Sequence, residues 1–485
     1  MLLRSQVIIS RRHPRESGDP APRVCAAYDS HVRYRSRWIP AFAGMTQVCV
    51  LLVLLLSLTA CHSLFGKDDA DSDKPKDEGK RVSALDVSKK PSADKGVTDF
   101  KPNLPTPVAN KDWPQAGGST THTLPQPALS PNPDVIWRAD IGNGTSGYFR
   151  LLARPVISGG KVFTLDARGT VSAFSMANGD RAWRFDTTPT DRDEAMGGGL
   201  GITNNRLYVT TGFGEVIALN AADGKVIWRK MIGKPFRADP TIADDRVYVL
   251  SIDNELTALS AKDGNVEWHH NGIAESATLM GASSPAVDGD SVVVAYSSGE
   301  IFNLRAQNGR VAWTDVLAVP AQVGALPAIA DIRGLPVIDR GRVYAVSHSG
   351  RMAAIDQRTG DRVWEVDVGG INTPVVAGDA VFILSNDNEL MALTRESGRI
   401  VWIKELQHLK DPTDRDSTPM FWQGPVLAGG RLWLTNSLGH LVAFDPNDGG
   451  QRADIEVADS FFIPPIVANN MMVLVSDDGR VMGLR

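Results

Sequence analysis

Cysteine is nearly absent from this 485-residue chain. The three cysteines are Cys25, Cys49 and Cys61, and none follows position 61. Everything after that position therefore has no disulfide, no thiolate chemistry and no cysteine-based zinc site.

An excess of charge of one sign and a long apolar run are also missing. Lys and Arg total 51, Asp and Glu total 56, and the formal net charge is −5. Without a basic excess, nucleic acid is not expected as a partner. The longest apolar run, residues 47–60, is shorter than the roughly 20 residues of a membrane-spanning helix. Hydrophobic residues nevertheless make up 42% of the chain, enough for a large core.

The apolar run ends in a short motif with a meaning of its own. Residues 47–60 read QVCVLLVLLLSLTA, and Leu58-Thr59-Ala60-Cys61 resembles the lipobox of bacterial lipoproteins. We predict a lipoprotein signal peptide over residues 45–60 and lipidation of Cys61. His62 stands where inner-membrane lipoproteins of this type tend to have Asp, so the resemblance implies the periplasmic face of the outer membrane. The alternative is a buried or membrane helix with an incidental cysteine.

The segments on either side of this signal do not look folded. Residues 1–44 are interpreted as a spurious or upstream extension, with the true start near Met45. That start leaves no basic residue before the apolar run, whereas an upstream start would supply Arg33, Arg35 and Arg37. Residues 66–110 are rich in Lys, Asp, Ser and Pro, which predicts a flexible tether from the lipidated cysteine to residue 110.

A repeated pattern occupies the rest of the chain and is the main evidence for the fold. Each unit has three short apolar strands and then a motif of Ala, an apolar residue, four residues, Gly, three residues and Trp. The copies are AFSMANGDRAW (173–183), ALNAADGKVIW (218–228), ALSAKDGNVEW (258–268), NLRAQNGRVAW (303–313), AIDQRTGDRVW (354–364), ALTRESGRIVW (392–402) and the degenerate AFDPNDGGQRA (443–453).

The physical chemistry of the motif predicts a β-sheet of four strands. Asp-Gly and Asn-Gly favour tight hairpin turns, because such turns need residues with positive φ. A Trp in the last strand can fill the space between neighbouring sheets, and the small Ala leaves room for its ring. The predicted structural tryptophans are Trp137, Trp183, Trp228, Trp268, Trp313, Trp364 and Trp402.

The spacing and the two ends of the repeat region predict a closed ring. A period of 40–50 residues with four short strands is typical of a propeller blade. The C-terminal unit stops after its third strand at VMGLR (481–485), while DVIWRADIG (134–142) is an isolated fourth strand. Residues 111–485 are therefore predicted to form an all-β, eight-bladed β-propeller of four antiparallel strands per blade, closed by the N-terminal strand completing the last blade.

Motifs that carry catalysis are absent or weak. Gly197-Gly198-Gly199-Leu200-Gly201 leads into a strand pattern and not into a helix, which argues against a phosphate-binding loop. His269-His270 lacks the i, i+4 spacing of helical zinc ligands. We predict no catalytic residue, no metal site and no cofactor.

The repeats resemble those of pyrroloquinoline-quinone dehydrogenases, which are also eight-bladed. That resemblance implies a calcium ion held by carboxylate and amide oxygens, a catalytic Asp and a vicinal cysteine pair, and the mature chain lacks such a pair. A periplasmic quinoprotein-like enzyme, or a ligand-binding propeller with a divergent site, remains the alternative function.

The lipobox, the tether and eight such repeats together resemble the BamB family, lipoproteins of the outer-membrane β-barrel assembly machinery. The resemblance covers residues 58–485. It implies a non-catalytic scaffold that binds the POTRA domains of BamA and works with other subunits to insert barrel proteins. Unfolded outer-membrane proteins are a further candidate partner.

Two neighbouring connections are predicted to form the partner surface. They are residues 269–285 and 314–336, both of which follow a fourth strand and so lie on one face of the ring. By resemblance, BamA contacts map to Leu279 and Met280 in the first and to Asp331 and Arg333 in the second. Leu279 and Asp331 match the family pattern, whereas Met280 and Arg333 depart from it. We expect Leu279 at the centre and the two charged residues at a rim that fixes orientation.

Overall fold

The structure is a computed structural model that describes residues 90–97, 99–191, 194–319, 329–458 and 460–485. The upstream extension, the signal peptide and the lipidation site Cys61 lie outside these residues. In the part of the chain that is described, no helix has the length and apolar character to cross a membrane.

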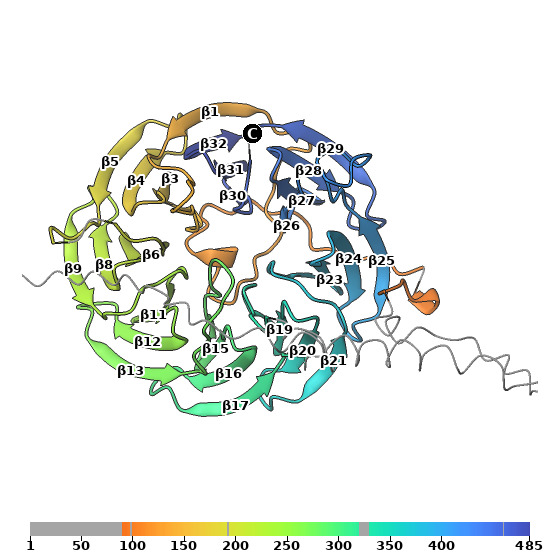
Figure 1. Ribbon diagram of the computed structural model, residues 1–485, viewed down its shortest axis with the longest axis horizontal. Helices are drawn as coiled ribbons and strands as arrows, with labels where there is room; N and C mark the ends of the chain where they lie inside the picture. Colours follow the sequence, from red (N-terminus) through yellow and green to blue (C-terminus); the bar gives the residue numbers. More distant parts are fainter. Residues whose placement is uncertain (1–89, 98, 192–193, 320–328, 459) are drawn as a thin grey trace, which may run out of the picture. The chain divides into compact units, whose positions relative to one another are not determined.

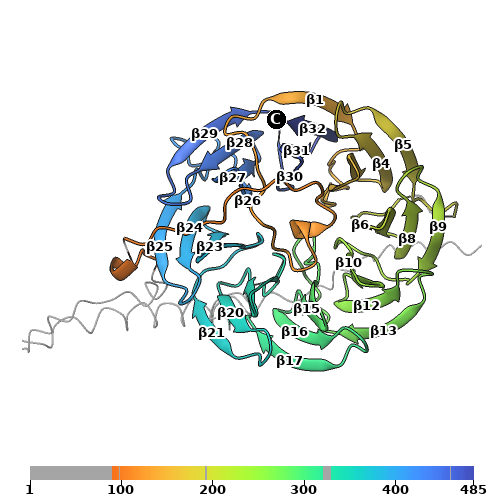
Figure 2. The same ribbon diagram turned by 180° about the vertical axis from the view of Figure 1, so that it is seen from behind.

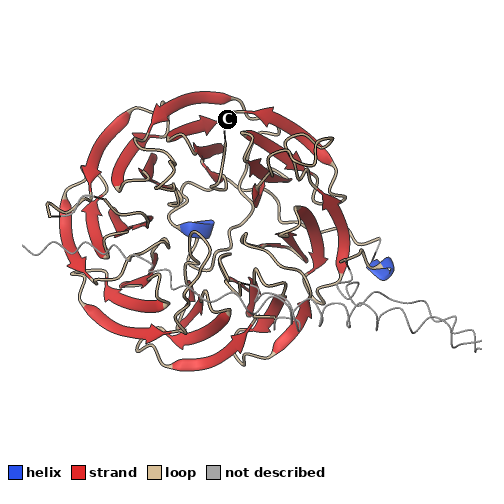
Figure 3. Ribbon diagram, in the orientation of Figure 1, coloured by secondary structure: helices blue, strands red, loops and turns tan. Residues whose placement is uncertain are grey.

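Runs of alternating Val, Ile, Leu and Tyr between Gly-containing turns form 32 short strands in the described residues. They make eight sheets of four antiparallel strands, which confirms the predicted eight-bladed β-propeller. Figures 1 and 3 show the sheets arranged radially around a centre. Each blade is numbered by its order around the ring.

Blades 1–4 comprise the following strands, from the innermost to the outermost: β2 (Val156–Ser158), β3 (Lys161–Leu165), β4 (Thr170–Ser175) and β5 (Arg181–Asp186); β6 (Gly198–Thr203), β7 (Arg206–Thr211), β8 (Glu215–Asn220) and β9 (Val226–Met231); β10 (Thr241–Ala243), β11 (Arg246–Leu250), β12 (Glu255–Ser260) and β13 (Val266–Asn271); β14 (Ala286–Asp288), β15 (Ser291–Ala295), β16 (Glu300–Arg305) and β17 (Val311–Val316).

Blades 5–8 follow in the same order: β18 (Val337–Asp339), β19 (Arg342–Val346), β20 (Met352–Asp356) and β21 (Arg362–Val366); β22 (Val375–Ala377), β23 (Ala380–Leu384), β24 (Glu389–Thr394) and β25 (Ile400–Glu405); β26 (Trp422–Ala428), β27 (Arg431–Asn436), β28 (His440–Phe444) and β29 (Gln451–Glu456); β30 (Ile466–Ala468), β31 (Met471–Ser476), β32 (Arg480–Leu484) and β1 (Val135–Asp140).

Blade 8 combines strands from the two ends of the propeller sequence. β1 pairs antiparallel with β32, and Trp137 lies opposite Gly483. The ideal Cβ of a residue at position 483 would fall 2.3 Å from the Trp137 ring, so only Gly fits there. Figures 1 and 2 show β1 at the outer edge of this blade, next to β5.

The tryptophans of the repeat join seven of the eight blades to the next by one recurring contact; blade 7 has Ala453 at this position. The indole N–H of Trp228 donates to the Ala261 carbonyl of the following blade at 3.2 Å, and that of Trp268 donates to the Ala306 carbonyl at 2.9 Å. The equivalent donors are Trp137, Trp183, Trp313, Trp364 and Trp402. Because six of the seven lie opposite a small Ala or Gly, the sheet has room for their rings.

The repeat glycine has a second role besides its turn conformation. At Gly264 φ is +73°, and an ideal Cβ there would lie 2.7 Å from the Trp228 ring of the preceding blade. Gly309 stands in the same relation to Trp268. This packing also accounts for Ala453, because blade 8 has no hairpin between β32 and β1 and so has no turn glycine to receive a ring.

The N-terminal segment contacts the propeller earlier in the chain than the sequence predicted. The tether was expected to run to residue 110, yet Asp94 forms an ion pair with Arg399 at 2.7 Å and Asn103 donates its backbone N–H to Asp379. Two 3-10 helices lie in this region, η1 (Lys95–Val97) and η2 (Ala116–Gly118). Apolar Val97, Phe100 and Leu104 pack on the core of blades 6 and 7, which is why this stretch is ordered on the propeller.

Residues 108–129 then cross the centre of the ring and bond to the inner strands of many blades. Backbone hydrogen bonds join Trp113 to Ile157, Pro114 to Ile202, Thr120 to Val287, Thr121 to Ile338 and Pro127 to Gly429. The Gln115 side chain bonds both backbone groups of Ile242. Figures 1 and 3 show η2 near the centre, so this segment, which we call the central strap, lies across the centre of the ring.

Candidate docking face and central cavity

The long connections between blades all lie on one side of the ring. In a blade of four antiparallel strands, the connections after the second and the fourth strand leave from the same edge. We call this side the loop face; its connections between blades are residues 141–155, 187–197, 232–240, 272–285, 317–336, 367–374, 406–421 and 457–465. The two connections predicted to form the partner surface are among them.

The structure brings these two connections into contact. The backbone N–H of Leu279 donates to a carboxylate oxygen of Asp331 at 2.8 Å, and the Ser283 hydroxyl donates to the Gly334 carbonyl at 3.2 Å. Asp331 is also held through its own carbonyl, which accepts the N–H of His348. Residues 269–285 and 329–336 are thus one joined surface, while residues 320–328 lie outside the described part.

Asp331 does not occupy the exposed rim position that the sequence suggested. Its side chain is only 4% exposed, and burial raises the pKa of its carboxyl above the usual range while the Leu279 N–H lowers it. A buried carboxylate that accepts a backbone N–H organises a loop. Asp331 therefore positions Leu279 within the predicted partner surface.

Apolar side chains are exposed on the same connections. Ile273 is 60% exposed and Met280 is 41% exposed on the first connection, and Ile329 is exposed on the second, whereas Leu279 is half-buried. Tyr148 and Phe421 are exposed on other connections of the loop face. Exposed apolar groups on a rigid scaffold are typical of protein-binding surfaces. On the predicted partner surface the side chains of Met280 and Ile273 are therefore more exposed than that of Leu279.

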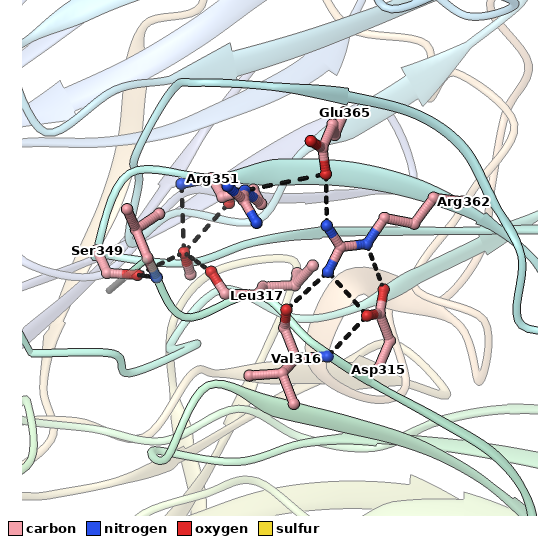
Figure 4. Close-up of polar contacts among 9 residues, drawn as sticks. Asp315, Val316, Leu317, Ser349, Arg351, Arg362 and Glu365 are labelled. Carbon is pink, nitrogen blue, oxygen red and sulfur yellow. Dashed lines mark hydrogen bonds and ion pairs between the residues drawn. The ribbon is translucent and has the colours of Figure 1, made fainter. Parts of the chain in front are cut away.

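A polar cluster between blades 4 and 5 holds the start of the 317–336 connection (Figure 4). Arg362 on β21 bonds both carboxylate oxygens of Asp315 on β17 at 2.8 Å and the Val316 carbonyl at 2.7 Å. The guanidinium also contacts Glu365. The Ser347 hydroxyl donates to the Leu317 carbonyl at 3.0 Å, and Ser349 accepts the Val319 N–H. A bidentate arginine gives this anchor a fixed geometry.

Arg333, predicted at the rim, instead lines a cavity at the centre of the loop face. The cavity has a volume of about 120 Å³, and its walls combine polar groups with apolar ones, among them Leu152, Leu335 and Val375. Arg333 is half-buried, and burial together with Arg154 lowers the pKa of its guanidinium to about 10. The sequence argument placed Arg333 correctly in the connection but wrongly at its outer edge, because the connection turns inward after Ile332, which is buried.

Arg154 reaches the same cavity from the opposite side of the ring. It forms an ion pair with the buried Asp239 at 2.9 Å, and Asp239 also accepts the N–H of Leu200. Blade 2 lies between the two partners, and Gly199 makes room, since an ideal Cβ there would fall 2.4 Å from Asp239. The glycine-rich stretch at 197–201 therefore serves close packing of inner strands.

His122 of the central strap completes the cavity lining. It is 6% exposed, its Nδ1 lies 2.7 Å from the Pro336 carbonyl, and its Nε2 is buried without a hydrogen-bond partner in the described structure. Burial lowers the pKa of His122 to about 4; the Pro336 contact opposes this shift and Arg154 adds to it. The ring is therefore neutral at pH 7.

Sequence reasoning missed Arg154, Asp239 and His122. Arg154 and Asp239 each precede the proline that begins an inner strand, as Leu335 and Thr373 do, and several residues at this position line the cavity. Alignment of the units at this proline would have singled out two charged residues among mostly uncharged ones. Nothing in the sequence near His122 predicts a crossing of the channel.

The lining does not match the set that a calcium quinoprotein needs. Among the described lining residues there are two arginines, one histidine and several amides, but no carboxylate. Across the described ranges, no three His, Cys, Asp or Glu side chains come together as a metal site.

The eight four-stranded sheets define the protein as an eight-bladed β-propeller. A family model described as outer membrane protein assembly factor BamB matches residues 167–404 and 411–485, which is more than half of the chain. The BamB of Salmonella typhimurium is 31% identical over 367 residues, covering 74% of this chain and 91% of that protein. The BamB of Xanthomonas campestris is 31% identical over 359 residues, with 73% and 86% covered. The chain belongs to the BamB family of outer membrane protein assembly factors.

Solved structures show the same architecture. The BamB of Moraxella catarrhalis superimposes with a TM-score of 0.63 at 20% identity, covering 73% of this chain and all of that one. A quinohemoprotein alcohol dehydrogenase from Comamonas testosteroni gives a TM-score of 0.60 at 13% identity, with 78% and 81% covered. At such identities the likeness concerns the fold alone.

Proposed function

We propose that the protein is a non-catalytic scaffold of the outer-membrane β-barrel assembly machinery. It is anchored by lipid on Cys61 to the periplasmic face of the outer membrane and binds POTRA domains of BamA through the loop face. The observation that carries the proposal is the joined surface of residues 269–285 and 329–336, with its hydrogen bond between Leu279 and Asp331 and its exposed Ile273 and Met280.

The mode of binding follows from the chemistry of this surface. Met280 and Ile273 provide apolar area that a partner can bury, and a flexible Met adapts to an uneven surface. The Asp331 contact and the Arg362 anchor fix the two connections before the partner arrives, which lowers the entropy lost on binding. In this proposal the protein holds its partner in position and catalyses no reaction.

Replacing Met280 by Asp should sharply reduce recovery of BamA with the lipidated protein. The change puts a charge at the centre of the apolar surface without touching a blade core, so the fold should be retained. The measurement is co-purification of BamA from detergent-solubilised membranes, with circular dichroism to check the fold.

Met231→Asp is the matched control, because Met231 is exposed to a similar degree but lies on the outer strand β9. It should recover BamA as the unsubstituted protein does. Equal recovery by a folded Met280→Asp protein, and by an Ile273→Asp protein, would reject this surface as the docking site.

Replacing Cys61 by Ala should leave a protein that is not lipidated and not processed at this position. The reason is that the thiol of Cys61 is the proposed acceptor of the lipid. Mass spectrometry and membrane fractionation test this together. If the variant keeps the mass and the membrane recovery of the unsubstituted protein, Cys61 is not the anchor.

A further inference from the structure

We propose that the cavity at the centre of the loop face is a binding site for a carboxylate carried on a small apolar body. The groups that would recognise it are the guanidiniums of Arg154 and Arg333 and the imidazole of His122. Arg333 belongs to the 329–336 stretch of the proposed docking surface, but its side chain lines the central cavity, whereas the exposed Ile273 and Met280 that carry the docking proposal do not.

The charges in the cavity are positive and only partly compensated. Arg154 uses one terminal nitrogen on Asp239, while Arg333 has no hydrogen bond or ion pair within the described residues. Neither Asp239 nor Asp331 lines the cavity. Burial is the main cause of the lowered pKa of Arg333; the positive charge of Arg154 lowers it further, and Asp331 opposes the shift. An anion between the two guanidiniums would relieve their repulsion, and arginine favours carboxylates through paired N–H donors.

His122 adds a requirement for a hydrogen-bond donor. Its Nδ1 faces the Pro336 carbonyl, so the proton of the neutral ring is on Nδ1 and Nε2 is an acceptor. Nε2 is buried and has no partner in the described structure, which costs free energy unless a ligand supplies an N–H or O–H. A ligand that satisfies these groups therefore needs a carboxylate and, close to it, a hydrogen-bond donor.

The apolar walls and the size of the cavity set the remaining features of the ligand. Leu335, Val375, Pro425, Phe462 and Ile463 lie around the polar groups, and the volume is about 120 Å³. This is room for one small apolar group. An N-acylated amino acid with an apolar side chain has all three parts: the carboxylate, the amide N–H and the apolar group. The C-terminal residue of a polypeptide has the same three parts.

The experiment uses N-acetyl-leucine as the probe and the full-length protein in detergent, with binding followed by titration calorimetry. N-acetyl-leucine should bind, and N-acetyl-leucinamide should bind at least about tenfold more weakly because it lacks the charge. 4-Methylpentanoate, which has the carboxylate but no N–H, should be weaker than N-acetyl-leucine. A tripeptide ending in leucine distinguishes the sources: equal binding points to a chain end, and no binding points to a free acid.

Arg333→Gln should reduce the affinity for N-acetyl-leucine at least about tenfold, since Gln keeps a donor but removes the charge. Arg237→Gln is the control, because Arg237 is a half-buried arginine of the same face outside this cavity. The proposal is overturned if the amide binds as well as the acid, if neither binds at millimolar concentration, or if the folded Arg333→Gln protein binds the acid unchanged. BamA recovery is not expected to change with the probe, so failure here leaves the docking proposal standing.

Discussion

Replacing Trp268 by Ala should lower the free energy of unfolding by about 3–5 kcal/mol, the usual cost of removing a buried aromatic side chain. The ring is buried between blades 3 and 4, lies over Gly309, and has its centroid 5.8 Å from that of Tyr248. The change also leaves the Ala306 carbonyl without its indole donor. Because protein stabilities are typically about 5–15 kcal/mol, the midpoint of urea denaturation should fall clearly.

Two further variants distinguish the stability contributed by the indole ring from that of its hydrogen bond and from that of other residues in the same strand. Trp268→Phe keeps most of the ring and should lose about 1 kcal/mol from the missing donor. Val266→Ala changes an exposed residue of the same strand, β13, and should shift the midpoint little. If Trp268→Ala and Val266→Ala shift the midpoint equally, the Trp268 contact between blades does not stabilise the propeller.

Acidification from pH 6.5 to pH 4 should destabilise the protein by about 3 kcal/mol through His122 alone. The pKa of His122 is about 4 in the folded protein, because its burial disfavours the charged ring, while an unfolded histidine titrates near 6.5. Between these values the unfolded chain binds a proton that the folded chain does not. Stability from this residue is therefore complete above pH 6.5 and is lost as the pH falls towards 4.

His122→Asn is the suitable variant for this measurement. His122 has a φ of +59°, which Asn tolerates better than most residues, and the Asn amide can still donate to the Pro336 carbonyl. Urea denaturation at a series of pH values should give a shallower acid dependence for His122→Asn, by about 3 kcal/mol over the interval. His408→Gln removes a histidine from an exposed connection and serves as the control. Parallel curves for the unsubstituted and His122→Asn proteins would show that the ring is not held neutral.

The partner surface shows where a sequence argument holds and where it stops. The two connections could be assigned to one face from strand order alone. In a four-stranded antiparallel sheet, the connections after the second and the fourth strand leave from the same edge. The roles of the individual residues could not be assigned in this way. Asp331 and Arg333 are two residues apart, yet one binds the Leu279 N–H and the other turns into the central cavity. Which way each side chain points depends on neighbouring blades.

The central strap is a second feature whose contacts could not be predicted from the sequence. Residues 111–485 are assigned by sequence to the propeller as a whole, without a separate segment here, and the named elements of the described residues before β1 are two 3-10 helices. Composition does not show that Trp113, Gln115 and Thr121 bond to inner strands of three different blades. Those acceptors and donors become available only when the ring has formed, since inner strands have an unpaired edge facing the channel.

The sequence by itself determined the blade. The spacing of Ala, Gly and Trp in each unit, with the fourth strand of blade 8 at the other end of the repeat region, is local information that repeats until the ring closes. Only the tertiary structure decided the centre of the ring, where Arg154, Arg333 and His122 come from three segments far apart in the sequence. The spacing of residues in the sequence does not predict such a site. Its residues come together through the radial arrangement of the blades and through a strap that contains no repeat.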